Sequence, residues 1–364
     1  MRPLARLPLL ILGFLALLVG AGAGLARLGW SVPDLAVSAS SLHGPLMICG
    51  FFGVVIPLER AVALGRLWAY AGPLFAGIGT VFALAGAPSI ALWFIVAASL
   101  VLLAATIDIF RRQTALFTFT LALGALCWST GSVLWAGGAT VHEVVTWWLA
   151  FPILTIAGER LELSRFLPPS PIARHAFAAI LAVIVAGLLG AGLPWGSPVF
   201  GGGLIALSLW LVKQDIARRT VRNKGLTRFI AVCLLSGYVW LAVGGAVIVA
   251  AGGLAPGSPS YDAALHALAL GFVFAMVIGH APIIFPAILR VSVPYHPTFY
   301  LPLALLHMSL VVRIAGDATA QFDWTRVGGL LNALALAAFI VSTASAVIRG
   351  QCNRSANTGG DVPT

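Results

Sequence analysis

The sequence predicts an all-α integral membrane protein with about twelve transmembrane helices. Of its 364 residues, 60% are hydrophobic and only 9% are charged, against about 25% charged residues in a typical soluble domain. Apolar runs long enough to cross a hydrocarbon core of about 30 Å recur along the whole chain. This composition excludes a soluble enzyme, a disordered protein and a nucleic-acid binder. The runs are continuous and do not alternate, which excludes an outer-membrane barrel.

Turn-rich breaks divide the chain into twelve expected spans, numbered one to twelve in chain order. We expect residues 1–350 to form a single polytopic domain and the polar residues 351–364 to form a disordered cytoplasmic tail. The spans are expected near residues 7–28, 36–57, 68–86, 89–108, 115–137, 140–158, 175–193, 197–213, 228–253, 261–285, 298–316 and 326–348.

The basic residues predict the orientation. With both termini in the cytoplasm, 18 of the 21 Lys and Arg residues fall on the inner side, and only Arg27, Arg313 and Arg326 fall outside. Positive charge accumulates on the cytoplasmic side of membrane proteins, so the net charge of +10 is interpreted as topological anchoring. The expected location is a bacterial-type inner membrane, with the lipid bilayer as a partner and no nucleic acid.

Three histidines recur at intervals of four spans. His43, His142 and His266 lie in the outer parts of spans two, six and ten. Glu59-Arg60 follows His43 by 16 residues, and Glu159-Arg160 follows His142 by 17. This pattern favours three quasi-repeated arcs of four helices each.

His43 and His266 are the first candidate cofactor ligands. An ionisable residue inside a membrane is expected to be functional, and imidazole is the commonest metal ligand. For His142, close to its helix end, the wet interface is the alternative interpretation. Asp262 precedes His266 by one turn, where it either orients the imidazole or is a solvated loop acid.

His280 and His307 complete the candidate metal ligands. His280 lies 14 residues after His266, which is about 21 Å along a helix, so the two cannot hold one metal ion. It fits a second site deeper in the membrane or a polar path from the cytoplasm. His307 lies near the middle of span eleven and is a further candidate ligand.

The segment LHGPLMICGFFGVVIP resembles the second helix of the haem–copper oxidase subunit I superfamily. Its His-Gly-x-x-Met pattern falls on His43, Gly44 and Met47, and the resemblance implies that His43 is an axial ligand of a low-spin haem. It also implies twelve spans in three arcs and a second axial ligand on span ten, where His266 is the positional match. The segment HALALGFVFAMVIGHAPIIFPAIL resembles the shorter NnrS-type membrane proteins of that superfamily. That likeness implies haem, copper and a link to nitric oxide.

The chain departs from the oxidase pattern at the binuclear centre. Span ten has no His-x-His and span seven has no His-His pair. A complete haem–copper centre is therefore not recognisable, and whether the protein is an enzyme stays open.

Three functions fit the sequence. The first is a haem-binding membrane protein with an electron-transfer, sensing or nitric-oxide-related role, served by a redox partner protein. The haem would be of b type because the sequence has no CxxCH for covalent attachment. The second is a transporter or channel without haem, lined by buried polar groups such as Glu59, Glu159 and Asn332. The third is a membrane scaffold or assembly factor.

Overall fold

The computed structural model describes residues 3–163 and 170–358, and within these ranges the chain forms helices and no strand. Twelve helical spans are long and apolar enough to cross a membrane, so the chain is a multi-pass, all-α membrane protein, as predicted. The first six spans comprise η1 (Pro3–Arg6) with α1 (Leu7–Arg27), the run η2 (Ser40–Leu42), α3 (His43–Pro45), η3 (Leu46–Phe52) and α4 (Gly53–Leu64), η4 (Leu67–Tyr70) with α5 (Ala71–Leu84), α6 (Pro88–Arg112), α7 (Leu116–Ala136) and α8 (Val141–Leu163).

The last six spans are also single helices or runs of consecutive helical segments. They comprise α9 (Pro171–Leu189), α10 (Gly196–Gln214), α12 (Gly225–Ala250), the run α13 (Pro259–His266), η6 (Ala267–Phe274) and α14 (Ala275–Leu289), η7 (Pro297–Phe299) with α15 (Tyr300–Ala318), and α16 (Phe322–Thr358). Two short helices, α2 (Asp34–Ser38) and α11 (Ala217–Thr220), lie in connections.

Helix ends follow local chemistry. After α4, Gly65 adopts a φ of 68°, a left-handed conformation that glycine takes without a steric penalty. Before α13, the Ser258 hydroxyl accepts a hydrogen bond from the Tyr261 backbone N–H, and Pro259 occupies the first helical position. Proline suits that position because its missing N–H would have no helical partner there. These signals place the starts and ends of the helices.

Spans two, six and ten form the centre of the bundle. Between 67 and 72% of their apolar windows is buried, against at most 56% in any other span of the described chain. The α4 helix contacts α14, and α8 contacts both η3 and η6. Convergence of every fourth span is the arrangement that three four-helix arcs predict. The three spans share one end that carries His43, called here the His43 end, and an opposite end that carries Arg60, called the Arg60 end.

Two of the central spans contain a wide helical turn beside a histidine. The π-helical segment η3 begins three residues after His43, and the π-helical segment η6 begins directly after His266. Such segments are rare and are frequent at functional sites.

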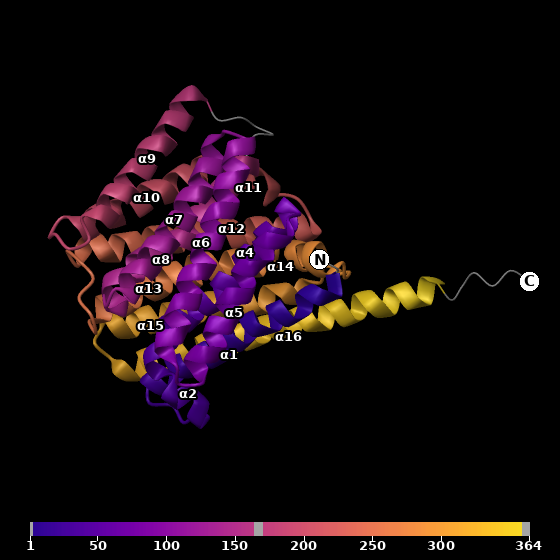
Figure 1. Ribbon diagram of the computed structural model, residues 1–364, viewed down its shortest axis with the longest axis horizontal. Helices are drawn as coiled ribbons and strands as arrows, with labels where there is room; N and C mark the ends of the chain where they lie inside the picture. The colour runs from indigo at the N-terminus through magenta and orange to yellow at the C-terminus, as the bar shows by residue number, and fades with distance from the viewer. Residues whose placement is uncertain (1–2, 164–169, 359–364) are drawn as a thin grey trace, which may run out of the picture.

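The last span is longer than a bilayer requires. The 37 residues of α16 correspond to about 55 Å of helix, and Figure 1 shows its C-terminal part projecting beyond the other helices. The helix continues past the predicted boundary at residue 350 because no glycine or proline interrupts residues 351–358. Residues 359–364 of the expected tail lie outside the described residues.

Candidate functional site

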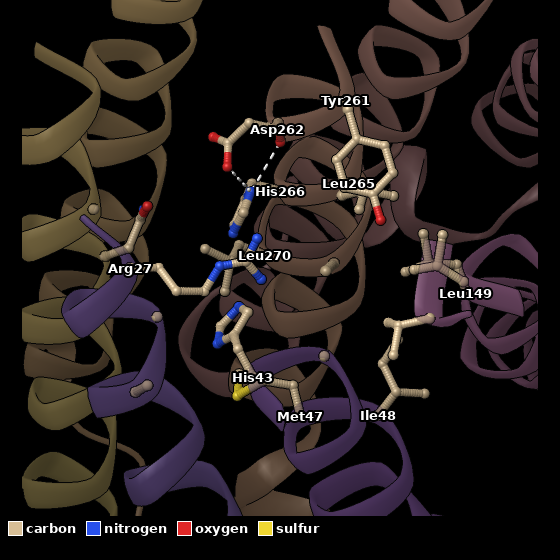
Figure 2. A pocket seen from close by; sticks show the side chains of 18 of the residues that line it. Arg27, His43, Met47, Ile48, Leu149, Tyr261, Asp262, Leu265, His266 and Leu270 are labelled. Carbon is tan, nitrogen blue, oxygen red and sulfur yellow. Dashed lines mark hydrogen bonds and ion pairs between the residues drawn. The ribbon is translucent and has the colours of Figure 1, made fainter. Parts of the chain in front are cut away.

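The structure brings His43 and His266 together, although 223 residues separate them in sequence. Their ring centres are 6.2 Å apart, and their planes differ by 21°. Figure 2 shows the two imidazoles pointing toward one another across a pocket. The two histidines on spans two and ten therefore form one site at the His43 end.

Both imidazoles are held in the same tautomer. The Nδ1 atom of His43 is 2.7 Å from the Gly20 carbonyl oxygen, and that of His266 is 2.8 Å from the Asp262 carbonyl oxygen. A carbonyl can only accept, so each Nδ1 donates its proton. In the neutral ring the Nε2 atom then keeps its lone pair, which is the state that a metal-ligating histidine requires.

The spacing of the rings suits a single metal ion between them. A metal bound by two opposed imidazoles lies about 2.0–2.1 Å from each nitrogen, which places the two ring centres about 6.3 Å apart. The observed separation is 6.2 Å. Both rings could stand perpendicular to a planar macrocycle, since their planes are nearly parallel. The separation and the near-parallel planes of the two rings are compatible with two ligands on opposite sides of one metal ion.

Helix α1 is shaped to admit the His43 ring. A Cβ atom on Gly24 would lie 2.8 Å from Cε1 and 2.9 Å from Nδ1 of His43, closer than real side chains approach one another. Only glycine at this position leaves room for the ring. One turn earlier, the Gly20 carbonyl oxygen accepts the hydrogen bond from His43 Nδ1. Sequence reasoning missed this notch, because an apolar helix rich in glycine gives no sign of which glycine faces a ligand.

A chain of polar groups supports the Nδ1 side of the His266 ring. One Asp262 oxygen lies 3.3 Å from His266 Nδ1, and the carboxylate receives two hydrogen bonds from the Arg313 guanidinium at 2.7 and 2.8 Å. Asn332 lies 3.4 Å from Arg313 and donates to Ser309 at 2.6 Å. Of the two interpretations of Asp262, the structure favours the orienting role. The sequence analysis counted Arg313 only as one of three basic residues on the outer side, although a charge inside an apolar span is itself a signal of function.

A cavity of about 470 Å³ adjoins the two histidines, within the usual range of ligand pockets. Its walls come from α1, α8, α15, α16 and spans two and ten. Figure 2 shows Met47 and Ile48 on one side, Leu265 on the other, and Leu149 at the far end. The cavity therefore joins a pair of imidazoles to an apolar slot.

Residues 6–348 match a protein family described as "Domain of unknown function (DUF8744)". The chain belongs to this family. The matched region contains both members of the histidine pair and reaches into the last span. No curated protein matches the chain.

The other three candidate histidines lie elsewhere or face elsewhere. His142 is exposed and lines the mouth of the same cavity, where its Nε2 is 3.3 Å from the Thr140 hydroxyl. His307 receives a hydrogen bond on Nδ1 from Trp240 and lies 2.9 Å from Ser236 through Nε2. Because the tryptophan can only donate, Nε2 of the neutral ring carries the proton, which leaves no lone pair for a metal. His307 therefore joins α15 to α12 in this structure.

His280 lies at the Arg60 end, with its Nδ1 bonded to the Met276 carbonyl oxygen at 2.7 Å. As the spacing predicts, it is remote from the ring pair. Within residues 3–163 and 170–358, no group of three or more His, Cys, Asp or Glu side chains is placed to hold a metal ion.

The Arg60 end contains ion pairs between spans. Arg60 bonds to Glu159 of span six and lies 3.5 Å from its neighbour Glu59. Arg160 lies 3.9 Å from Asp215, which also accepts a 2.6 Å hydrogen bond from the Tyr238 hydroxyl. The two predicted Glu-Arg motifs thus cross-link the centre of the bundle.

Proposed function

We propose that the protein binds a b-type haem between His43 and His266 and serves electron transfer. The observation that carries the proposal is the ring pair: two imidazoles at 6.2 Å, each with Nδ1 bonded to a carbonyl oxygen. The likeness to the second helix of the haem–copper oxidase subunit I superfamily and to NnrS-type proteins supports it. The haem would be held without a covalent bond to the chain.

The residues around the pair suit a flat, mostly apolar ligand. Ile48, Leu149 and Leu265 offer aliphatic contacts to a macrocycle, and burial of such surface stabilises a complex by about 25 cal/mol per Å². Gly24 admits the His43 ring, while Asp262 and Arg313 hold His266 in place. When bound, haem would supply a one-electron redox couple.

Electron transfer is favoured over the sensing and nitric-oxide-related roles because both axial positions would be filled by protein ligands. A gas could then bind only by displacing an imidazole that is fixed by its hydrogen bond. Nitric oxide added to the reduced protein should leave its spectrum unchanged under this proposal. A new spectrum at low nitric oxide concentration would instead favour the gas-related role.

Absorption spectroscopy of the purified protein tests the proposal. Expressed in a haem-sufficient host, the protein should show Soret and α bands of a low-spin haem. His43→Ala and His266→Ala should each abolish them, while His296→Ala, an exposed histidine outside the site, should keep them. Absence of haem bands in the folded wild-type protein would remove the proposal. Metal analysis of the same sample would show whether copper is present as well.

A haem-free transporter is the second candidate. It is favoured by the charged groups at the Arg60 end, where Arg60, Glu159 and Asp215 lie inside a membrane bundle. A folded, haem-free preparation that moves a solute into lipid vesicles would favour this function. Loss of solute uptake in the Glu159→Gln variant would show that the transport path passes through the Arg60 end.

We infer that the chain lies in a bacterial-type inner membrane with both termini in the cytoplasm. The distribution of the Lys and Arg residues supports this orientation. The haem would then face the outer side, where a redox partner protein would exchange electrons with it. Reporter fusions at the C-terminus and after Gly138, a turn between α7 and α8, should give opposite signals.

A further inference from the structure

Helix α1 presents one continuous face to the histidine pair. The Gly20 carbonyl oxygen accepts a hydrogen bond from His43 Nδ1, and Gly24 makes room for the His43 ring. Arg27 follows three residues later and ends the helix. Because positions i, i+4 and i+7 share a helix face, the backbone alone places Arg27 on the side that carries the notch.

The Arg27 side chain extends into the cavity. It belongs to the cavity wall, and Figure 2 shows it reaching from α1 toward the space between the two imidazoles. The guanidinium is thus beside the axis on which the two rings face one another.

The two arginines of the cavity differ in their partners. Arg313 forms an ion pair with Asp262, so its charge is already balanced. Arg27 makes no ion pair or hydrogen bond among the described residues. The cavity therefore presents one uncompensated cation beside two neutral imidazoles, and its other walls are mostly apolar.

A guanidinium is a donor whose planar fork matches a carboxylate. A b-type haem is an apolar disc with two carboxylate side chains on one edge, and their negative charge complements the unbalanced cation of Arg27. We propose that Arg27 binds the propionate carboxylates of the tetrapyrrole and fixes which edge of the disc faces α1. This inference rests on the proposed function and assigns to Arg27 the selection of a tetrapyrrole with free carboxylates.

Two tetrapyrroles test the inference directly. The full-length apoprotein in one detergent is titrated with protohaem IX and with its dimethyl ester, which lacks the negative charges, and binding is followed at the Soret band. The preference for the free acid over the diester should fall about tenfold from wild type to Arg27→Gln, the effect of losing a charged hydrogen bond. Arg27→Lys should keep part of it. Comparing proteins in the same detergent cancels the different partitioning of the two ligands.

Arg326→Gln is the matched control. Arg326 lies near the same end of the bundle, but its guanidinium stacks 4.3 Å from the Trp30 ring and donates to the Gly29 carbonyl oxygen. This variant should keep the wild-type preference. Arg27→Gln could instead lower the affinity for both tetrapyrroles equally, or keep the wild-type preference for the free acid. Either result would overturn the inference while leaving the proposal of haem binding intact. Failure of the wild-type protein to form a low-spin complex with either tetrapyrrole would overturn the proposed function itself.

Discussion

The two ends of the central spans use polar residues in opposite ways. At the Arg60 end, Arg60 bonds to Glu159 and Arg160 lies against Asp215, so charge meets charge. At the His43 end, His43 and His266 are neutral rings. Each ring uses its Nδ1 atom for a hydrogen bond to a backbone carbonyl oxygen, and its Nε2 atom faces a cavity. Satisfied groups hold helices together, whereas groups with unused lone pairs beside a cavity are prepared for a ligand.

The largest effect on haem binding, short of removing a ligand, is expected at the notch in α1. Gly24→Ala would place a methyl group 2.8 Å from the His43 ring and displace it from its position opposite His266. Haem affinity should fall about 10- to 100-fold, as is typical when the support of a metal-ligating histidine is disturbed. Titration of the apoprotein with haem measures the change.

Gly202→Ala in α10 is the control for this substitution, because its new Cβ would meet no atom within 4 Å and Gly202 does not line the cavity. An unchanged affinity in Gly24→Ala, or an equal loss in both variants, would show that the notch does not position the ligand.

The next largest effect on haem binding is expected at Asp262, which supports His266. Asp262→Asn should weaken haem binding about tenfold, because the side chain no longer supports the imidazole and leaves Arg313 without its partner. Loss of this negative charge should also raise the midpoint potential, since the ferric state carries the larger positive charge. Redox titration measures it, and a lowered potential would contradict the assigned role.

Substitution at the Arg60 end should separate stability from haem binding. Glu159→Gln removes the partner that joins span six to span two and should lower the free energy of unfolding by about 1–3 kcal/mol. The haem spectrum should stay unchanged. Thermal unfolding followed by tryptophan fluorescence measures the first effect, and a shifted Soret band would show that the two ends are coupled.

The smallest effect is expected for His142. Its ring is exposed at the mouth of the cavity, so His142→Ala should preserve both the haem bands and the haem affinity. A changed spectrum would make it a ligand and would require a different arrangement of the site.

The number of spans and the proximity of His43 to His266 could be predicted from the sequence, for physical reasons. Hydrocarbon-length apolar runs predict helices without knowledge of their neighbours, and all twelve were found. His43 and His266 could be singled out because imidazoles are costly in an apolar span. The fourfold spacing of the spans then placed them near one another.

The supporting groups could not be predicted, because packing between distant segments decides them. Nothing near His43 in sequence indicates that the Gly20 carbonyl accepts a hydrogen bond from its ring, or that Asp262 forms an ion pair with Arg313 of span eleven. The hydrogen bond from Trp240 to His307 Nδ1 likewise joins two spans and leaves no sign in the sequence. The π-helical turns η3 and η6 leave no trace in hydropathy, since they alter the backbone and not the composition.

Electron paramagnetic resonance of the oxidised, purified protein tests the central claim most directly. Two imidazole ligands on one haem iron should give a low-spin ferric signal in the wild-type protein, replaced by a high-spin signal or by no haem signal in His43→Ala and in His266→Ala alike. A high-spin signal in the wild-type protein, or a low-spin signal that survives either substitution, would contradict the account.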